Sequence, residues 1–544
     1  MPVSAVVDFP MLLLDHPLLI QSIRTAAPMS RRKLPIGIQT FAKMREVDYY
    51  YVDKTGFIAR LIDEGSFYFL SRPRRFGKSL LLDTIGELFA GNEPLFRGLI
   101  IHPDWDWSLR HPVIRLSFGG GVVRSREQLE RRIRSQLGRN LSALHLKCPD
   151  PLDNIGCFEW LIEQAHHISG QRAVVLVDEY DKPILDNLSR PELARELRDG
   201  LRNLYSVIKD READVRFVFI TGVSKFSRVS LFSGLNNLRD ITVSPSYSAL
   251  CGYTEKDVET VFAPEWQDLD REEIRLWYNG YNWLGDAVYN PFDLLLLFQE
   301  RELRSYWFET GSPSGLIELL MQRGIFTPDL SQTFADDALL SSFDVDHIAT
   351  EALLWQTGYL TFAETQRIGA RARYRLTYPN LEVQSALNDV LAKALLGNAS
   401  QASRLAGQLQ DILQAGDPEP LRAHLHSLFA AIPHHWHDNA PIAHYEGYWA
   451  SVFYSHLAAL GLDVIAEDIT HQGRIDLTLK LAHQIWLFDF KVAERSPPGS
   501  ALRQLKDKGY ADKYRALGKP ITLIGIAFSE QQRQVAGFEL ERLD

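Results

Sequence analysis

The chain has 544 residues, of which 45% are hydrophobic and 24% are charged, a composition typical of a globular protein long enough for three or four domains. Its formal net charge of −10 argues against a nucleic-acid-binding surface that is basic all round. Three cysteines without metal-ligand spacing favour a reducing cytoplasm over a disulfide framework, and the lack of any long apolar run predicts no membrane span.

An N-terminal extension is predicted over residues 1–33. Residues 9–20 are apolar, but Asp15 and Pro17 interrupt them and no basic stretch precedes them. This pattern argues against a signal peptide.

Residues 67–88 predict a strand, a loop and a helix, and the loop has the sequence of a phosphate-binding loop. Gly77, Lys78 and Ser79 match the end of the P-loop pattern, although Arg72 stands where the pattern has a glycine. Backbone N–H groups of such a loop bind phosphates, while the lysine reaches the terminal phosphates and the serine hydroxyl coordinates Mg²⁺. The alternative is a basic, solvated turn before a helix. The residues predicted to bind ATP here are Arg74, Arg75, Phe76, Gly77, Lys78, Ser79 and Leu80.

A buried strand is predicted at 173–178, followed by two acids. Asp178 and Glu179 follow five apolar residues, and nucleotide sites of parallel sheets lie at the carboxyl ends of their strands. We therefore expect Asp178 to hold Mg²⁺ and Glu179 to polarise the attacking water. Thr221 ends another predicted strand, 215–221, where it either senses the γ-phosphate or simply closes the strand before a glycine.

The remaining pattern divides the chain into regions. Strands at 67–70, 112–117, 173–178 and 215–221 alternate with helical stretches, so that 34–250 predicts a parallel α/β P-loop core. Residues 251–345 predict a helical lid. Residues 346–432 predict helices and a winged-helix-like unit with strands at 357–362 and 373–377, and 433–438 a linker. The last region, 433–544, predicts a second α/β domain.

A second group of chemically active residues lies in a predicted hairpin over 473–492. A turn centred on Ala482 and His483 would place Asp476 opposite Asp489, with Lys491 on the same face. Like charges in that position destabilise a hairpin, unless they hold a cation such as Mg²⁺. The residues expected on the opposite, core face are Ile475, Leu477, Leu479, Trp486, Phe488 and Phe490. Taken by its spacing alone, an Asp-x-Lys triplet is equally typical of a solvated hairpin.

Helices flank this hairpin on both sides. Glu446 lies in the first turn of one, where an acid also simply complements the helix dipole. Gln504 lies on the other, predicted at 500–517 and followed by a strand at 521–528. Residues 491–519 carry eight basic and three acidic side chains, which suit either a phosphate-backbone partner or a solvated helix face.

Taken together, these motifs resemble a bacterial family of predicted ATPases with a C-terminal PD-(D/E)XK nuclease-like domain. The sequence stretches that carry the resemblance are Leu34-Pro-Ile-Gly37, Tyr51-Val-Asp-Lys-Thr55, Arg72–Ser79, Val177-Asp-Glu-Tyr-Asp-Lys-Pro183, Tyr289-Asn-Pro291, Tyr378-Pro-Asn-Leu-Glu-Val383, Gly473-Arg-Ile-Asp476 and Lys508-Gly-Tyr-Ala511. By resemblance, Arg72 is a family trait. The residues that the resemblance places in a nuclease site are Glu446, Asp476, Asp489, Lys491 and Gln504.

The sequence thus predicts an ATP-hydrolysing module coupled to a Mg²⁺-dependent nuclease that acts on DNA or RNA. Asp476, Asp489 and the carbonyl oxygen of Phe490 would bind the metal, and Lys491 would orient the water. The alternative is a nucleotide-driven switch or scaffold whose nuclease-like domain binds nucleic acid or protein without cutting. A homo-oligomer is left open, because no arginine can be assigned to a neighbour's γ-phosphate.

Overall fold

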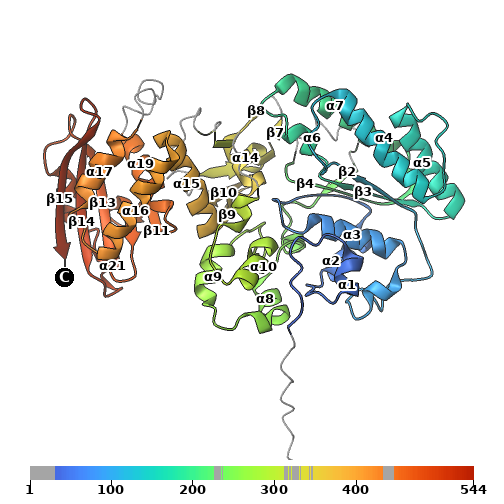
Figure 1. Ribbon diagram of the computed structural model, residues 1–544, viewed down its shortest axis with the longest axis horizontal. Helices are drawn as coiled ribbons and strands as arrows, with labels where there is room; N and C mark the ends of the chain where they lie inside the picture. The colour runs from blue at the N-terminus through green and yellow to red at the C-terminus, as the bar shows by residue number, and fades with distance from the viewer. Residues whose placement is uncertain are drawn as a thin grey trace, which may run out of the picture.

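The computed structural model describes residues 31–225, 237–310, 347–369, 371–432 and 446–543, with shorter pieces between 235 and 344. Figure 1 shows an elongated molecule with one α/β sheet at each end and a mostly helical region between them. In the described part of the chain, no helix is long and apolar enough to span a bilayer.

The N-terminal sheet is parallel, with the strand order β2-β3-β4-β1-β5. Its strands are β1 (Phe67–Ser71), β2 (Val113–Ser117), β3 (Ala173–Asp178), β4 (Val215–Gly222) and β5 (Arg239–Asp240). The four predicted strands are confirmed. The two-residue β5 was not predicted, because it is too short to show a periodicity.

Helices cover both faces of this sheet, as a parallel sheet requires. On one face lie α1 (Phe41–Glu46), α2 (Thr55–Glu64) and α3 (Lys78–Phe89), and on the other α4 (Arg126–Ala143), α5 (Asn154–Ser169) and α7 (Pro191–Asp210) (Figure 1). The short α6 (Lys182–Leu185) follows β3 directly. Ser125 and Asp153 cap α4 and α5 with their side chains, as their residue types favour.

The middle region begins with α8 (Glu255–Val261), α9 (Arg271–Tyr278), α10 (Pro291–Glu300) and α11 (Tyr306–Glu309). It continues with α14 (Thr350–Thr357), β9 (Thr361–Ile368), β10 (Arg371–Thr377) and α15 (Leu381–Leu396), and β6 (Phe334–Asp336) completes a sheet of order β6-β10-β9. The predicted order helix, strand, strand, helix is found. The strand expected at 357–362 begins later, because α14 occupies the chain up to Thr357 and Gly358, at φ 94°, ends that helix.

Two predicted helices are each split in two. The helix expected across 399–432 consists of α16 (Ala399–Ala415) and α17 (Leu421–Ala430), separated at Gly416. The helix expected at 500–517 consists of α20 (Ser500–Asp507) and α21 (Asp512–Arg515), with Gly509 at φ 55° between them. The predicted linker at 433–438 lies outside the described residues.

The C-terminal sheet has the order β11-β12-β13-β14-β15 and is mixed, since only β13 and β14 run parallel. Its strands are β11 (Asp463–Thr470), β12 (Gly473–Lys480), β13 (Ile485–Val492), β14 (Ile521–Ser529) and β15 (Gln534–Leu543), and α19 (Glu446–Ala458) precedes them. The edge strands β11 and β15 were not predicted. Helices α16, α17 and α19 pack with one face of the sheet, while α20 and α21 cover the other.

Candidate functional site

The loop between β1 and α3 forms a turn that leaves room for a ligand. Gly77 has φ +84°, and no atom lies within 4 Å of the position that a Cβ would take there. Arg75 also has a positive φ, 68°, a conformation that costs free energy for a residue with a side chain and is often found at functional sites. Lys78 is buried, and its Nζ donates to the carbonyl oxygens of Arg72 (3.0 Å) and Pro73 (2.8 Å). Burial lowers the pKa of Lys78, and nearby Asp178 opposes this shift.

Arg72, which stands in the place of the usual glycine, anchors the loop. Its guanidinium is fully buried, donates to the carbonyl oxygens of Thr242 (2.9 Å) and Tyr247 (3.1 Å), and lies 4.0 Å from the ring centre of Trp283. Burial lowers its pKa to about 10. Phe76, later in the same loop, packs edge-on against Tyr281 at 4.7 Å. The middle region therefore holds the loop in place.

The acids after β3 have different surroundings. Asp178 accepts a hydrogen bond from Ser79 Oγ at 2.6 Å through Oδ2, whereas its Oδ1 is buried without a hydrogen-bond partner in the described part of the chain. Glu179 has φ 49°, and its carboxylate lies against Gly119, where an added Cβ would be 3.0 Å from Oε2. Burial, and next the charge of Asp178, raise the pKa of Glu179. A carboxylate with a raised pKa is suited to accept a proton from water near neutral pH.

Thr221 lies at the end of β4, between β1 and β3 in the sheet. Its side chain is fully buried, and Oγ1 has no hydrogen-bond partner among the described residues. Thr221 does not line the cavity described next. Direct contact with a ligand in that cavity is therefore not supported for Thr221.

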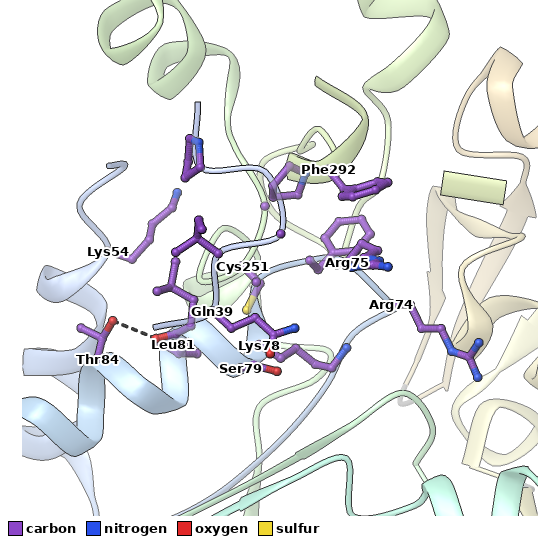
Figure 2. A pocket seen from close by; sticks show the side chains of 18 of the residues that line it. Gln39, Lys54, Arg74, Arg75, Lys78, Ser79, Leu81, Thr84, Cys251 and Phe292 are labelled. Atoms are coloured by element: carbon purple, nitrogen blue, oxygen red, sulfur yellow. Dashed lines mark hydrogen bonds between the residues drawn. The ribbon is translucent and has the colours of Figure 1, made fainter. Parts of the chain in front are cut away.

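A cavity of about 530 Å³ opens beside the loop, and all seven predicted loop residues line it together with Glu179. Figure 2 shows Lys78 and Ser79 facing this space, whereas Arg74 points away from the other labelled side chains. Arg75 lies 4.6 Å from the ring centre of Phe292 in α10. Asp178 does not line the cavity itself and adjoins it through Ser79.

Much of the cavity wall was missed by sequence reasoning. The additional lining includes Pro35, Gly37, Ile38, Gln39, Tyr50, Tyr51, Val52, Lys54, Leu250, Cys251, Tyr253, Phe292 and Leu295. The signal is present in Leu34–Gly37 and Tyr51–Thr55, two motifs that carry the family resemblance without a predicted role. Lys54 donates to Asp257 at 2.6 Å, and this contact fixes the motif against the first helix of the middle region.

A nucleotide with Mg²⁺ fits these residues. The space above Gly77 can take a phosphate, and the unpartnered Asp178 Oδ1 beside the Ser79 hydroxyl supplies the hard oxygen ligands that Mg²⁺ prefers. The apolar part of the wall suits a nucleoside base.

The predicted hairpin of the second site is confirmed, with its turn at Ala482 and His483. Leu477 pairs with Phe488 and Lys480 with Ile485, and Leu481 N donates to Gln484 O at 2.9 Å to close the turn. The ladder ends one pair before Asp476, so the predicted pairing of Asp476 with Asp489 is not formed; the Asp476 carboxylate instead accepts a hydrogen bond from Phe490 N at 2.7 Å. Burial raises the pKa of Asp476.

One core residue of this hairpin was placed wrongly. Ile475 packs with Leu487 and Tyr510 beneath α20, on the face opposite Leu477. The reason is a local irregularity: Glu467 in β11 has φ 53°, and neither it nor Asp476 takes part in the ladder. The side chains of β12 therefore change from one face of the sheet to the other at Asp476.

Asp489 is fully buried and lies at the centre of a charged group. Its Oδ2 is 2.7 Å from Lys491 Nζ, and its Oδ1 accepts from Gln504 Nε2 at 2.7 Å. Lys491 Nζ also donates to the carbonyl oxygen of Phe490 at 3.0 Å. A cation, the ammonium of Lys491, thus lies between two of the oxygen atoms predicted to bind metal.

Two glycines allow the site to assemble. Gly525 pairs with Asp489 in the neighbouring strand, and a Cβ there would lie 2.4 Å from Leu502 N in α20. Only glycine therefore lets α20 approach closely enough for Gln504 to reach Asp489. Gly473 similarly leaves room for Tyr510 OH, which would be 2.6 Å from its Cβ, so the Gly473–Asp476 and Lys508–Ala511 motifs are in contact.

The donor set suits Mg²⁺ but is incomplete in the described residues. Glu446 is the first residue of α19, and the position of its side chain lies outside the described part of the structure. Among the described residues, no three acidic, histidine or cysteine side chains lie close enough to hold a metal ion. The oxygens of Asp476, Asp489 and Phe490 remain candidates by their chemistry.

The basic segment 491–519 is largely neutralised within the molecule. Its ion pairs join Arg495 to Glu530, Lys506 to Glu541, Lys513 to Asp468 and Arg515 to Asp512. The solvated-face interpretation therefore fits this segment better than a phosphate-backbone surface.

Comparisons with known proteins agree with both halves of the molecule. A family model described as predicted AAA-ATPase matches residues 35–232, and one described as PD-(D/E)XK nuclease superfamily matches residues 444–537. A protein described as "Uncharacterized protein in vnfD 5'region" of Azotobacter chroococcum mcd 1 is 64% identical over 516 residues, which are 95% of this chain and 100% of that protein. No solved structure matches the chain.

Proposed function

Because this chain belongs to the family of predicted AAA-ATPases with a C-terminal domain of the PD-(D/E)XK nuclease superfamily, we propose that it hydrolyses ATP and that ATP controls a phosphodiesterase in its C-terminal domain. The observation that carries the proposal is the meeting of Ser79 and Asp178 at 2.6 Å, beside the open turn at Gly77. The loop after β1, the start of α3 and the end of β3 each contribute one of these residues, as a nucleotide-hydrolysing site would need.

The residues of the first site have distinct tasks. Lys78 binds the terminal phosphates in exchange for its two loop carbonyls, and Asp178 with Ser79 holds Mg²⁺. Glu179 accepts the proton of the attacking water, which its raised pKa favours. Bound Mg²⁺ neutralises charge on the phosphate groups at either site.

At the second site, Asp476 and Asp489 with the Phe490 carbonyl hold the metal, and Gln504 fixes the orientation of Asp489. A metal at Phe490 O would take the place of the contact that Lys491 Nζ makes there. The Lys491 ammonium would orient water and stabilise the charge on the phosphorane-like transition state. The substrate class is nucleic acid.

Helix α15 couples the two sites. Trp307 Nε1 donates to the carbonyl oxygen of Arg74 at 3.2 Å, and Trp307 N donates to Glu382 Oε1 in α15 at 2.9 Å. Further along the same helix, Gln384 Nε2 donates to Tyr454 OH in α19 at 3.0 Å. A change in the phosphate-binding loop is thus transmitted to the helix that begins at Glu446.

The test compares Lys78→Ala and Asp489→Ala in the full chain. ATP hydrolysis is measured by phosphate release, and cleavage by incubation with plasmid, single-stranded DNA and RNA in Mg²⁺ or Mn²⁺, with and without ATP. Lys78→Ala should bind ATP about 10- to 100-fold more weakly, since it removes a charge-assisted contact. Asp489→Ala should lose cleavage and retain ATP hydrolysis. The matched controls are Lys209→Ala, at the end of α7, and Asp507→Ala, an exposed acid of α20.

Unchanged ATP affinity in a folded Lys78→Ala protein would contradict the first half of the proposal.

A second candidate function is a nucleotide-driven switch whose C-terminal domain binds without cutting. The ammonium of Lys491 between the predicted metal ligands favours it. Wild-type protein that hydrolyses ATP but cleaves none of the nucleic acids would establish this candidate instead.

A further inference from the structure

A second cavity, of about 480 Å³, lies where the middle region meets the C-terminal sheet. Its walls come from α9, the end of β10, the start of α15, Tyr454 of α19, and Val464–Ala466 of β11. In Figure 1 these elements lie left of the centre, between the C-terminal sheet and the rest of the middle region. The cavity is separate from both sites described above.

The charge of this cavity differs from that of the whole molecule. Arg275 and Arg375 line it, and no acidic residue is among its lining residues in the described part of the chain, although the protein carries a net charge of −10. The carboxylates that pair with these arginines, Glu272 at 2.9 Å and Glu364 at 3.5 Å, are exposed and lie outside the lining. Although both arginines are ion-paired, only their cationic groups reach the wall of the cavity, and this favours an anionic ligand inside it.

A buried donor without an acceptor also lines the cavity. Asn380 is only 7% exposed, its Oδ1 caps α15 by accepting from Val383 N at 3.1 Å, and its Nδ2 has no hydrogen-bond partner in the described chain. A buried amide N–H without a partner costs free energy, so a ligand oxygen at this position would be stabilising. The N-terminus of α15, a helix of 16 residues, adds positive potential at the same place.

A row of arginines leads out of this cavity along β10. Arg371, Arg373 and Arg375 alternate with the inward-facing Tyr374 and Leu376, so they share the outer face of the strand. Alternate residues are about 6.7 Å apart along a strand. Arg373 lies 3.8 Å from the ring centre of Phe334. Asp336 and Glu364, which pair with Arg373 and Arg375 in the neighbouring strands, are the acids of this face.

The other end of the cavity lies at β11, the edge strand of the C-terminal sheet, beside β12. Ala466 in the cavity wall pairs with Leu477 of β12, the residue next to Asp476. A ligand that followed the arginines through the cavity would therefore arrive at edge strand β11, next to β12, the strand that carries Asp476.

We propose that this cavity and the arginine row bind the phosphodiester backbone of a single nucleic-acid strand and guide it to the C-terminal site. A cavity of about 480 Å³ is in the range of small-molecule pockets, about 300–1,000 Å³. It can take a few groups of one strand but not a duplex, whose major groove alone is roughly 12 Å wide. Arg275 and Arg375 contact phosphates, and Asn380 Nδ2 donates to a phosphate or sugar oxygen. The binding of the strand does not depend on the proposed function; only the cleavage of the strand after binding does.

Binding is measured by fluorescence anisotropy of a short labelled single-stranded DNA with the full chain in EDTA, so that no cleavage is needed. Asn380→Asp keeps an N-cap of equal quality and replaces the unpartnered donor with a negative charge. It should weaken binding at least about tenfold. Arg371→Gln and Arg375→Gln should each weaken binding severalfold, and each should lower the slope of log Kd against log salt by about 0.7.

The chain offers a matched control for each change. Asn398 caps α16 by accepting from Gln401 N at 3.1 Å and is exposed, so Asn398→Asp adds the same charge at the same helix position away from the cavity. Arg139→Gln removes an exposed arginine from α4 in the N-terminal domain. Both controls should bind like wild type.

Wild-type protein that does not bind the strand, or Asn380→Asp protein that binds as well as Asn398→Asp, would overturn the proposal. A duplex that binds as tightly as the single strand would also overturn it. The same holds if inorganic phosphate or a mononucleotide displaces the oligonucleotide at an equal concentration. Variant-sensitive binding without any cleavage in Mg²⁺ would leave this proposal standing and refute the phosphodiesterase activity.

Discussion

Glu179 and Asp181 lie two residues apart, yet their hydrogen bonds differ completely. Asp181 is 1% exposed and accepts from Val223 N (3.1 Å), Ser224 N (2.6 Å) and Ser224 Oγ (2.5 Å), so its carboxylate joins the ends of β3 and β4. The Glu179 carboxylate faces the cavity beside Gly119. Both acids line the cavity, but the Asp181 carboxylate is occupied by these hydrogen bonds, so we expect Glu179 to be the one that meets a water molecule at a bound phosphate.

Glu179→Gln should therefore still bind ATP but hydrolyse it about 10²- to 10⁴-fold more slowly, as expected for loss of a general base. Asp181→Asn should instead lower the melting temperature, because an amide cannot accept all three hydrogen bonds. Steady-state hydrolysis and thermal melting of both variants distinguish the two roles. A Glu179→Gln enzyme with a normal rate would show that this carboxylate is structural.

Asp293 and Glu382 form a buried carboxyl pair between α10 and α15. Both are fully buried. Burial raises the pKa of each carboxyl group, to about 7 for Glu382, and the charge of Glu382 raises the pKa of Asp293 further. Glu382 also accepts from Trp307 N. We infer that the pair shares a proton at neutral pH.

This pair predicts a pH dependence of stability with a definite sign. In the unfolded chain both groups lose their protons near pH 4, whereas the folded chain retains protons up to about pH 7. The folded state therefore binds more protons across this window, and the pair's contribution to stability is lost as pH rises from about 4 towards 7 and above. Asp293→Asn, which donates an amide hydrogen to Glu382 at every pH, should reduce this loss. Melting temperatures of the two proteins that fall equally between pH 5 and pH 8 would contradict the assignment.

At the scale of elements, α15 connects regions that are distant in sequence. Glu382, its second residue, accepts from Trp307 N, and Gln384, two residues later, donates to Tyr454 of α19. Trp307→Phe keeps an aromatic ring but removes the indole hydrogen bond to the phosphate-binding loop. The control is Trp160→Phe in α5, far from the loop in sequence.

The expected result is a loss of coupling with little loss of binding. Trp307→Phe should bind ATP within a few-fold of wild type, since one neutral hydrogen bond contributes about 1 kcal/mol. The ratio of nucleic-acid cleavage with ATP to that without ATP should move towards one. If that ratio equals the wild-type ratio, coupling does not pass through Trp307.

Sequence periodicity predicted those elements whose side chains repeat clearly. The strand β3 shows an apolar run before two acids, and β12 alternates polar and apolar residues from Arg474 to Lys480. Sheet edges were harder: β11 and β15 mix polar with apolar residues because one side of each is open. The facing of Ile475 could not be predicted, since the cause is the conformation of Glu467 in another strand.

The same contrast holds for the candidate sites. The loop residues and both acid pairs follow from local sequence, because each lies within a few residues of a strand end. The roles of Arg72, Lys54 and Gly525 depend on partners far along the chain, namely Trp283, Asp257 and Leu502. No spacing in a single sequence reports such contacts.

At the scale of the whole molecule, the N-terminal domain shares a hydrophobic core with the middle region, whereas the C-terminal domain has cores of its own. One cluster of buried residues runs from Phe41 to Leu391 and so includes both the N-terminal domain and much of the middle region. The C-terminal domain has separate clusters on either side of its sheet. The two candidate sites therefore belong to different packing units.

Metal and nucleotide should consequently stabilise different transitions in calorimetry. With no nucleotide present, Mg²⁺ or Mn²⁺ at about 100 times its Kd should raise the free energy of unfolding of the C-terminal domain by about 2.7 kcal/mol. Asp489→Asn, which can keep the hydrogen bond with Gln504 but not the charge, should lose this gain. Metal that raises the melting temperature of the variant equally binds elsewhere.

Arg72 also constrains how this loop can change during evolution. A single substitution to glycine would restore the general P-loop pattern, but it would leave two buried carbonyl oxygens without a donor and a void against Trp283. We expect Arg72→Gly to cost at least about 3 kcal/mol, measurable by urea denaturation. The arginine and the tryptophan must therefore be exchanged together or kept together. Sequence searches that require the glycine should therefore miss relatives that keep this pair, however well their loops bind phosphate.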